Sequence, residues 1–231
     1  MRISKSGNIR KQELLDSALE LFYLNGFERT SIQDILDKVK ISKGTFYYYF
    51  KSKDELLDAI AFQLADRILS MMKSIIDDSS LNSLEKLNLI IAKAQKIKAE
   101  NIDNLIKIAK MLYVEENIKL RSRITDKTVE LAKPLLVQLF QKGNEEAVFD
   151  ISFPDETAEI YIRIGELFWT MILKLFDQLP ESLEQIKQKI VFFNELIERM
   201  LGVEKNSINI TNRVINTLQQ SNLFQKSKEE K

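Results

Sequence analysis

The stretch from Ser31 to Lys53, SIQDILDKVKISKGTFYYYFKSK, constrains the fold more than any other part of the chain. Its first apolar residues recur at the i, i+3, i+4 and i+7 spacing of a single helix face. These residues are Ile32, Ile35, Leu36 and Val39. Ser31 stands where an N-cap is expected, and Asp34 three residues later completes a capping-box pattern. The pattern therefore predicts a short helix that begins just after Ser31.

The helical period breaks at Lys40 and Ile41, which predicts a tight turn. Ser42 then offers a second N-cap hydroxyl, so a second short helix is predicted from Lys43 to about Phe50. Two short helices joined by a tight turn form the helix-turn-helix pattern, whose second helix lies in the major groove of DNA.

Five consecutive aromatic residues, Phe46 to Phe50, test this interpretation. Propensity alone favours a strand, but the preceding cap and the helical patterns on both sides favour a helix. In a helix, Phe46 and Phe50 share one face, which would pack on the preceding helices. Tyr47 and Tyr48 would then point outward, where a phenol can lie along a groove and bond a phosphate. The alternative is that the whole cluster is core.

Residues at two helix starts favour the DNA-binding interpretation. Lys43 is a donor for guanine or phosphate, Gly44 allows close approach of the backbone, and Thr45 can contact a thymine methyl group or a phosphate. Lys53, at the start of the next helix, is placed to bond a phosphate together with the free N–H groups of that helix.

The segment GFERTSIQDILDKVKISKGTFYYYFKSKDELL resembles the DNA-binding signature of the TetR/AcrR family of bacterial transcriptional regulators. The resemblance covers the first sixty residues or so and implies a set of DNA contacts on the two short helices and at the start of the next one. That set is Ser31, Gln33, Ser42, Lys43, Gly44, Thr45, Tyr47, Tyr48, Tyr49 and Lys53. The chain departs from the family at Lys40, where a small residue or glycine is common, and at Ala147, where glycine is frequent. A positive φ at Lys40 would bring modest strain.

Composition narrows the class of protein. Glycine and proline are scarce, with six and three residues among 231, and Leu, Ile, Lys and Glu are abundant, so an all-α fold is predicted. The chain has no cysteine or histidine, which excludes disulfides and removes the commonest general base and zinc ligand. An enzyme is therefore disfavoured, and we expect no metal or cofactor. No signal-peptide pattern or membrane-length apolar run is found, so we expect a cytoplasmic protein.

Charge is unevenly distributed although the net charge is zero. Through Lys53 there are ten Lys or Arg against six Asp or Glu, which leaves 24 against 28 in the remainder. A basic amino-terminal end attached to an acidic remainder is typical of a nucleic-acid-binding domain joined to a domain with another role.

The rest of the chain has the pattern of a helical domain. Helices are predicted over residues 9–25, 53–77, 82–97, 102–115, 118–142 with a kink at Pro134, 154–178 and 183–201. We expect an all-α fold with an N-terminal three-helix helix-turn-helix domain at 1–53. A C-terminal helical domain for effector binding and dimerisation is expected at 54–204, followed by a tail at 205–231 that forms an accessory helix or none.

Two successive amphipathic helices, at 155–178 and 181–201, carry more apolar surface than the first domain can cover. The same two helices of a second subunit would complete a four-helix bundle, so a homodimer is expected. The alternative is that these helices close the core of the monomer. Arg163 and Glu166, on the first of them, form either a ligand-reaching pair or an ordinary ion pair.

Several large side chains are of the kind that line adaptable apolar pockets. They are Met72, Met111, Tyr113, Phe168 and Trp169, and the alternative for each is plain core. The resemblance implies a homodimeric, ligand-responsive repressor that binds a palindromic operator in double-stranded DNA and a small, largely apolar effector. The side chains just named are the candidates for the effector site. The alternative is a DNA-anchored adaptor whose helical domain binds a protein partner.

Overall fold

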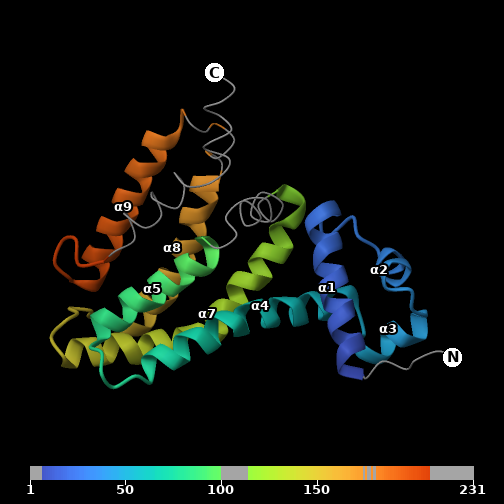
Figure 1. Cartoon of the computed structure of the whole chain (residues 1–231), viewed down its shortest axis with the longest axis horizontal. Helices are drawn as coiled ribbons and strands as arrows, with labels where there is room; N and C mark the ends of the chain where they lie inside the picture. Colours follow the sequence, from blue (N-terminus) through green and yellow to red (C-terminus); the bar gives the residue numbers. More distant parts are fainter. Residues whose placement is uncertain (1–6, 100–113, 174, 176–177, 179–180, 209–231) are drawn as a thin grey trace. The chain divides into compact units, whose positions relative to one another are not determined.

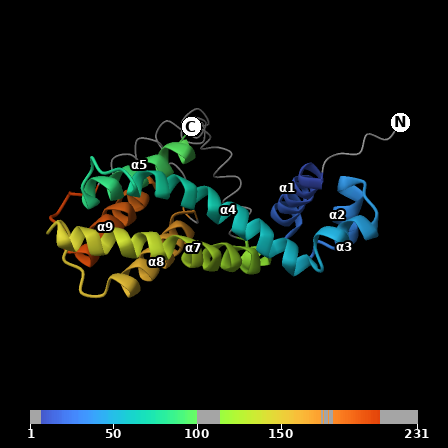
Figure 2. The same cartoon turned by 90° about the horizontal axis from the view of Figure 1, so that it is seen from below.

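The computed structural model describes residues 7–99, 114–173, 175, 178 and 181–208, and every regular element in these residues is helical (Figures 1 and 2). The elements are α1 (Gly7–Asn25), α2 (Ile32–Val39), α3 (Lys43–Tyr49), α4 (Lys53–Ile76), α5 (Ser83–Ala99), the 3-10 turn η1 (Glu115–Asn117), α7 (Ile118–Glu145), α8 (Pro154–Leu173) and α9 (Leu183–Leu201). The all-α prediction is confirmed. The helix predicted at 102–115 lies almost wholly outside the described residues, as do all but the first few residues of the tail.

The chain divides into two compact units. We call the first the head; its described residues are 7–65 and 114–127. The second, the body, has described residues 66–99 and 128–208 apart from 174, 176–177 and 179–180. Helices α4 and α7 each contribute residues to both units. The boundaries proposed at 53 and 204 stay predictions.

The head is built around a sealed aromatic and aliphatic core. Leu14, Ala18, Phe22, Ile35 and Phe46 have no exposed surface. Phe27 is also buried, and its ring meets that of Phe22 edge to face with centroids 5.1 Å apart. These contacts fix the angle between α1 and the two short helices, which is the requirement for presenting α3 as a rigid unit.

The start of α7 completes this core, which the sequence did not indicate. Leu120 is fully buried in the head cluster. The side-chain oxygen of the buried Asn117 accepts a hydrogen bond from the backbone N–H of Phe27 at 3.1 Å. Gly26 has φ +87°, and a Cβ there would lie 2.5 Å from the Cβ of Glu116. The close approach of η1 to this loop therefore requires glycine at position 26.

The body packs α8 against α9, which lie side by side in both views (Figures 1 and 2). The rings of Phe168 and Phe193 stack at 4.1 Å with an angle of 16° between their planes. Ile172, Ile186 and Ile190 are fully buried beside them. No helix of the described residues is long and apolar enough to cross a membrane.

The predicted end of α7 is wrong by about one turn. The helix continues through Pro134 and then through Gly143, ending at Glu145, and the left-handed residue that follows is Ala147 with φ 54°. Gly143 is needed for space, because a Cβ there would lie 2.0 Å from the Phe149 ring. The Asn144 side chain binds the backbone of Ile151 at 2.7 and 3.0 Å. A Gly-Asn pair that resembles a helix stop therefore serves to dock the following loop.

Candidate nucleic-acid interface

Helix α2 begins with the capping box that the sequence predicts. The Ser31 hydroxyl accepts from the backbone N–H of Asp34 at 3.1 Å, and the Asp34 carboxylate accepts from the Ser31 N–H at 2.7 Å. The carboxylate also accepts a bond from the Ser31 hydroxyl at 2.8 Å, and the bonds from the Ser31 backbone N–H and then from its hydroxyl lower the pKa of Asp34 below its ordinary value. The box satisfies backbone groups of the first turn of α2 with bonds inside a four-residue segment.

The turn between the two helices depends on a left-handed residue. Lys40 has φ 57° and ψ 51°, and its backbone N–H donates to the carbonyl of Leu36. The Ile41 N–H donates to the same carbonyl at 3.1 Å. The positive φ that the sequence analysis considered for Lys40 is therefore present. A residue other than glycine bears a modest strain in this conformation.

Helix α3 is short, and its cap and its buried face are both fixed. The Ser42 hydroxyl accepts from the Thr45 N–H at 3.2 Å and lies 2.9 Å from the Thr45 hydroxyl. Phe46 has no exposed surface, and Phe50 is nearly as buried. The aromatic run is thus helical, as predicted, and its two phenylalanines anchor α3 to the head.

The opposite face of α3 is open to solvent. Tyr48 is 81% exposed and Tyr47 is 46% exposed, while Lys43 and Gly44 are exposed at the start of the helix. Tyr49 is half-buried, with its ring edge to face with that of Tyr48 at 4.9 Å. Exposed tyrosine rings next to a lysine and a glycine form a surface that can lie against a nucleic-acid groove. The prediction that the tyrosines point outward is confirmed.

Helix α2 contributes fewer free groups. The Ser31 hydroxyl belongs to the capping box, and the Gln33 side chain donates to Asp37 at 2.8 Å. Both residues are exposed, so their side chains are accessible to the DNA backbone contacts predicted for them. Their contacts with DNA stay predictions.

Lys53 has a role that sequence reasoning missed. Its ammonium donates to the backbone carbonyls of Phe27 at 2.7 Å, Thr30 at 2.9 Å and Glu28 at 3.3 Å. It also lies 4.3 Å from the centre of the Phe27 ring. Partial burial lowers its pKa, an effect that the negative charge of Glu28 opposes. An ammonium has three protons, so the loop before α2 engages all of them. The phosphate contact predicted for Lys53 stays untested.

The sequence that forms this surface matches a known family. The family model for bacterial regulatory proteins of the tetR family matches residues 14–60, which contain all of α2 and α3. The head therefore carries the helix-turn-helix DNA-binding domain of the TetR family. The protein is a DNA-binding transcriptional regulator.

Relatives of the TetR family extend the similarity beyond the head. The HTH-type transcriptional repressor KstR2 of Mycobacterium tuberculosis is 27% identical over 195 residues, which cover 81% of this chain and 92% of that protein. The regulatory protein TetR of Rhodobacter sphaeroides has a TM-score of 0.54 at 20% identity, covering 82% of this chain and 97% of that one. The fatty acid degradation regulator FadR of Bacillus halodurans has a TM-score of 0.58 at 17% identity, covering 81% and 94%. These likenesses confirm the fold of head and body.

The candidate effector residues divide in the structure. Met72 and Phe168 are buried, Trp169 is half-buried, and Met111 and Tyr113 lie outside the described residues. The Arg163 guanidinium, which the sequence paired with Glu166, donates to the carboxylate of Glu159 at 3.0 Å.

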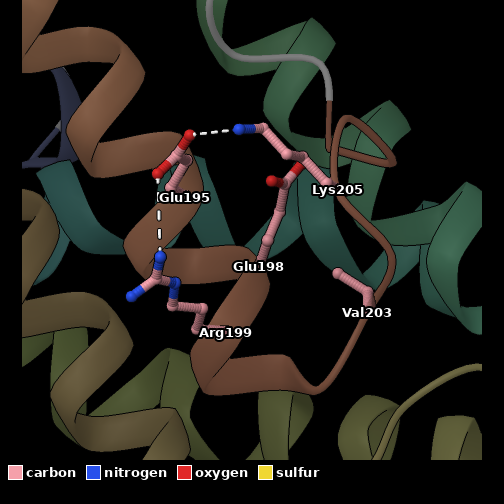
Figure 3. Close-up of a pocket in the computed structure, with 5 residues that line it drawn as sticks. All are labelled: Glu195, Glu198, Arg199, Val203 and Lys205. Carbon is pink, nitrogen blue, oxygen red and sulfur yellow. Dashed lines mark ion pairs between the residues drawn. The ribbon is translucent and has the colours of Figure 1, made fainter.

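A small depression at the end of α9 does not suit an effector (Figure 3). It encloses about 100 Å³ and is lined by Glu195, Glu198, Arg199, Val203 and Lys205. Glu195 pairs with Lys205 at 2.7 Å and with Arg199 at 4.0 Å, and the bond from Lys205 lowers the pKa of Glu195. Ligand pockets usually enclose about 300 Å³ or more. These charges hold the segment after α9 against that helix.

Proposed function

We propose that the protein is a ligand-responsive repressor that acts in the cytoplasm as a homodimer on a palindromic operator. The observation that supports this best is the division of α3 into two faces. Phe46 and Phe50 are sealed in the head, whereas Tyr47 and Tyr48 are exposed beside Lys43. An aromatic ring left in water is costly unless it has a partner to contact, and a groove of DNA offers one.

Some residues of α3 would contact base edges and others the sugar-phosphate backbone. Lys43 would donate to a guanine edge or to a phosphate, and Thr45 would contact a thymine methyl group. Tyr47 and Tyr48 would lie along the sugar-phosphate backbone, with Tyr49 supporting the Tyr48 ring. Ser42 and Gly44 would bring the backbone of α3 close to the groove. The similarity to the repressor KstR2, which extends along most of both chains, supports repression as the mode of action.

The homodimer would form through α8 and α9. Apolar side chains on these helices keep much of their surface exposed: Ile160 46%, Leu167 57%, Met171 39%, Val191 44% and Phe192 65%. A monomer rarely exposes so many large apolar groups on two adjacent helices. The same helices of a second subunit would bury them in a four-helix bundle and set two heads on one palindrome.

The effector would be a small, largely apolar molecule bound in the body. It would release the operator only if it binds one arrangement of the two heads more tightly than the other. No observation on the described residues favours the protein-binding adaptor.

The test begins with selection of the operator from a random DNA pool by the full-length protein. Lys43→Ala and Tyr48→Ala should each weaken binding of the selected duplex about tenfold or more in gel shifts at fixed salt. Lys73→Ala and Phe153→Ala remove exposed side chains from the body as matched controls and should leave the affinity unchanged. Wild-type affinity in both α3 variants would refute the role of this face.

A further inference from the structure

Helix α8 turns one uncharged face toward the interior of the body. Ala158, Phe168 and Ile172 on this face are buried, and the helical spacing places Tyr161 and Gly165 between them. These five positions follow one another at intervals of three and four residues, so they form a single stripe. None of them carries a charge, whereas Arg163, on another face, pairs with Glu159.

Gly165 lies in the middle of this face beside open space. Among the described residues, no atom comes within 4 Å of the position that a Cβ would occupy there. Gly143 provides the contrast, because a Cβ at that position would overlap the Phe149 ring. Glycine inside a helix is destabilising relative to alanine unless something requires it. Close packing accounts for Gly143, but no described neighbour accounts for Gly165.

Tyr161, one turn before Gly165, carries the polar group of the face. Its ring meets Phe140 edge to face at 6.1 Å. Burial raises the pKa of its hydroxyl to about 12, yet the residue keeps part of its accessible surface. Both statements hold if that surface opens into an interior space instead of bulk water. No hydrogen bond joins its hydroxyl to a described residue, and the hydroxyl is not one of the fully buried unpartnered atoms of these residues, so it can bond an atom that enters this space.

We propose that the space beside Gly165 receives the effector and that the Tyr161 hydroxyl donates a hydrogen bond to it. The ligand is then an uncharged, mostly apolar molecule with one acceptor oxygen, such as a ketone or an ester. A charged head group is disfavoured on this face, because a buried charge needs a partner and the face has none. The inference rests on the proposed effector function and assigns it a site and a chemical class.

Two aromatic residues beyond Gly165 make the site measurable. Phe168 lies on the same stripe of α8 as Gly165, and its ring stacks on that of Phe193 in α9. Trp169, four residues after Gly165, is the single tryptophan of the chain and packs edge to face on Phe168. A ligand in this space should change the fluorescence of Trp169, which no other residue obscures.

The experiment titrates the full-length protein with 2-decanone and with decanoate, which share a chain length and differ in charge. Trp169 fluorescence and the melting temperature report binding. 2-Decanone should bind and stabilise the protein. Decanoate should bind at least about tenfold more weakly than 2-decanone. Tyr161→Phe should weaken 2-decanone binding about threefold to tenfold, the effect of one neutral hydrogen bond, while decanoate binding stays as it was. Tyr23→Phe makes the same change in the head and should alter neither.

Gly165→Leu supplies the second arm. Its side chain should fill the space and weaken 2-decanone binding more than tenfold while the melting temperature is held or raised. A large fall in melting temperature would show that the space is already occupied and would overturn the proposal. So would wild-type binding in Tyr161→Phe or Gly165→Leu, equal affinity for decanoate, or no binding of 2-decanone by the wild-type protein. Gly165→Ala, with a smaller side chain, should lie between wild type and Gly165→Leu.

The same reagents separate this inference from the proposed function. If 2-decanone binds as described but leaves operator affinity unchanged in gel shifts, the site stands and the ligand-responsive role fails. If operator DNA is released by a different molecule whose binding is insensitive to both substitutions, the ligand-responsive role stands and this site fails.

Discussion

The exposed face of α3 in the head and the exposed face of α8 and α9 in the body differ in the polarity of their large side chains. In the head, Phe22, Phe27 and Phe46 are sealed, and the exposed aromatic rings of α3 belong to tyrosines with a polar hydroxyl. In the body, Leu167 and Phe192 are 57% and 65% exposed and have no polar atom to offer. Helix α3 therefore presents a surface suited to a polar partner. The body carries apolar surface that a second copy of the chain is suited to cover.

Removal of a sealed ring from the head should have the largest effect. Phe46→Ala should lower the free energy of unfolding by about 3–5 kcal/mol, because it leaves a cavity beneath α3. Tyr48→Ala in the same helix should change it by only about 0.5 kcal/mol, since that ring is in solvent. Urea unfolding followed by circular dichroism measures both. Equal losses in the two variants would contradict the division of α3 into a buried and an exposed face.

Charges on the exposed apolar surface of the body should act on assembly instead of folding. The double variant Leu167→Glu, Phe192→Glu should weaken self-association about 100-fold, or roughly 2.7 kcal/mol, because it would bury like charges at a two-fold interface. Sedimentation equilibrium measures the shift from dimer to monomer. Phe153→Glu, an equally exposed aromatic position outside both helices, is the control. A monomeric wild-type protein would refute the comparison itself.

The buried hydrogen bond between Phe27 and Asn117 tests how much η1 contributes to the stability of the head. Asn117→Ala leaves the backbone N–H of Phe27 without its acceptor in a buried position and should cost about 1–3 kcal/mol. Asn8→Ala, on the exposed start of α1, should cost less than about 0.5 kcal/mol. Both values come from the same urea titration. An unchanged midpoint for Asn117→Ala would mean that another acceptor replaces the lost one.

The smallest effect concerns acid. The pKa of Asp34 is lower in the folded head than its ordinary value of 3.8, because its carboxylate accepts bonds from Ser31. The stabilisation is therefore fully present above about pH 4 and is lost as the pH falls through the folded pKa. Asp34→Asn should be less stable than wild type at pH 7, and the difference should close as the pH falls through the folded pKa of Asp34. A difference that persists there would exclude the carboxylate charge as its source.

Much of the head could be predicted from local sequence, because its signals are local. The serine caps of α2 and α3, the break at Lys40 and the spacing of Phe46 and Phe50 act over three or four residues. The caps and the turn are formed by bonds among neighbouring residues, so the pattern of a few residues is enough to predict them. The outward direction of the tyrosines followed from the same spacing.

The missed features depend on contacts that reach beyond one helical turn, and most of them join residues that are distant in sequence. Lys53 binds carbonyls more than twenty residues earlier in the chain. Asn117 accepts a hydrogen bond from Phe27, in the loop between α1 and α2. Gly143 matches a helix stop until Phe149 folds back over it. The candidate pocket residues were uncertain for a similar reason. Periodicity places Phe168 on an inner face, but only the coordinates show whether a neighbour fills the space next to it.

The bond between Phe27 and Asn117 joins residues ninety positions apart. During synthesis, the ribosome must therefore release just over half of the chain before the amino-terminal unit has all of its parts. A fragment cut after α4 would lack Leu120 and this acceptor, so it should be a poor donor for grafting onto another regulator. A transplant that keeps the opening turns of α7 should preserve the native unit.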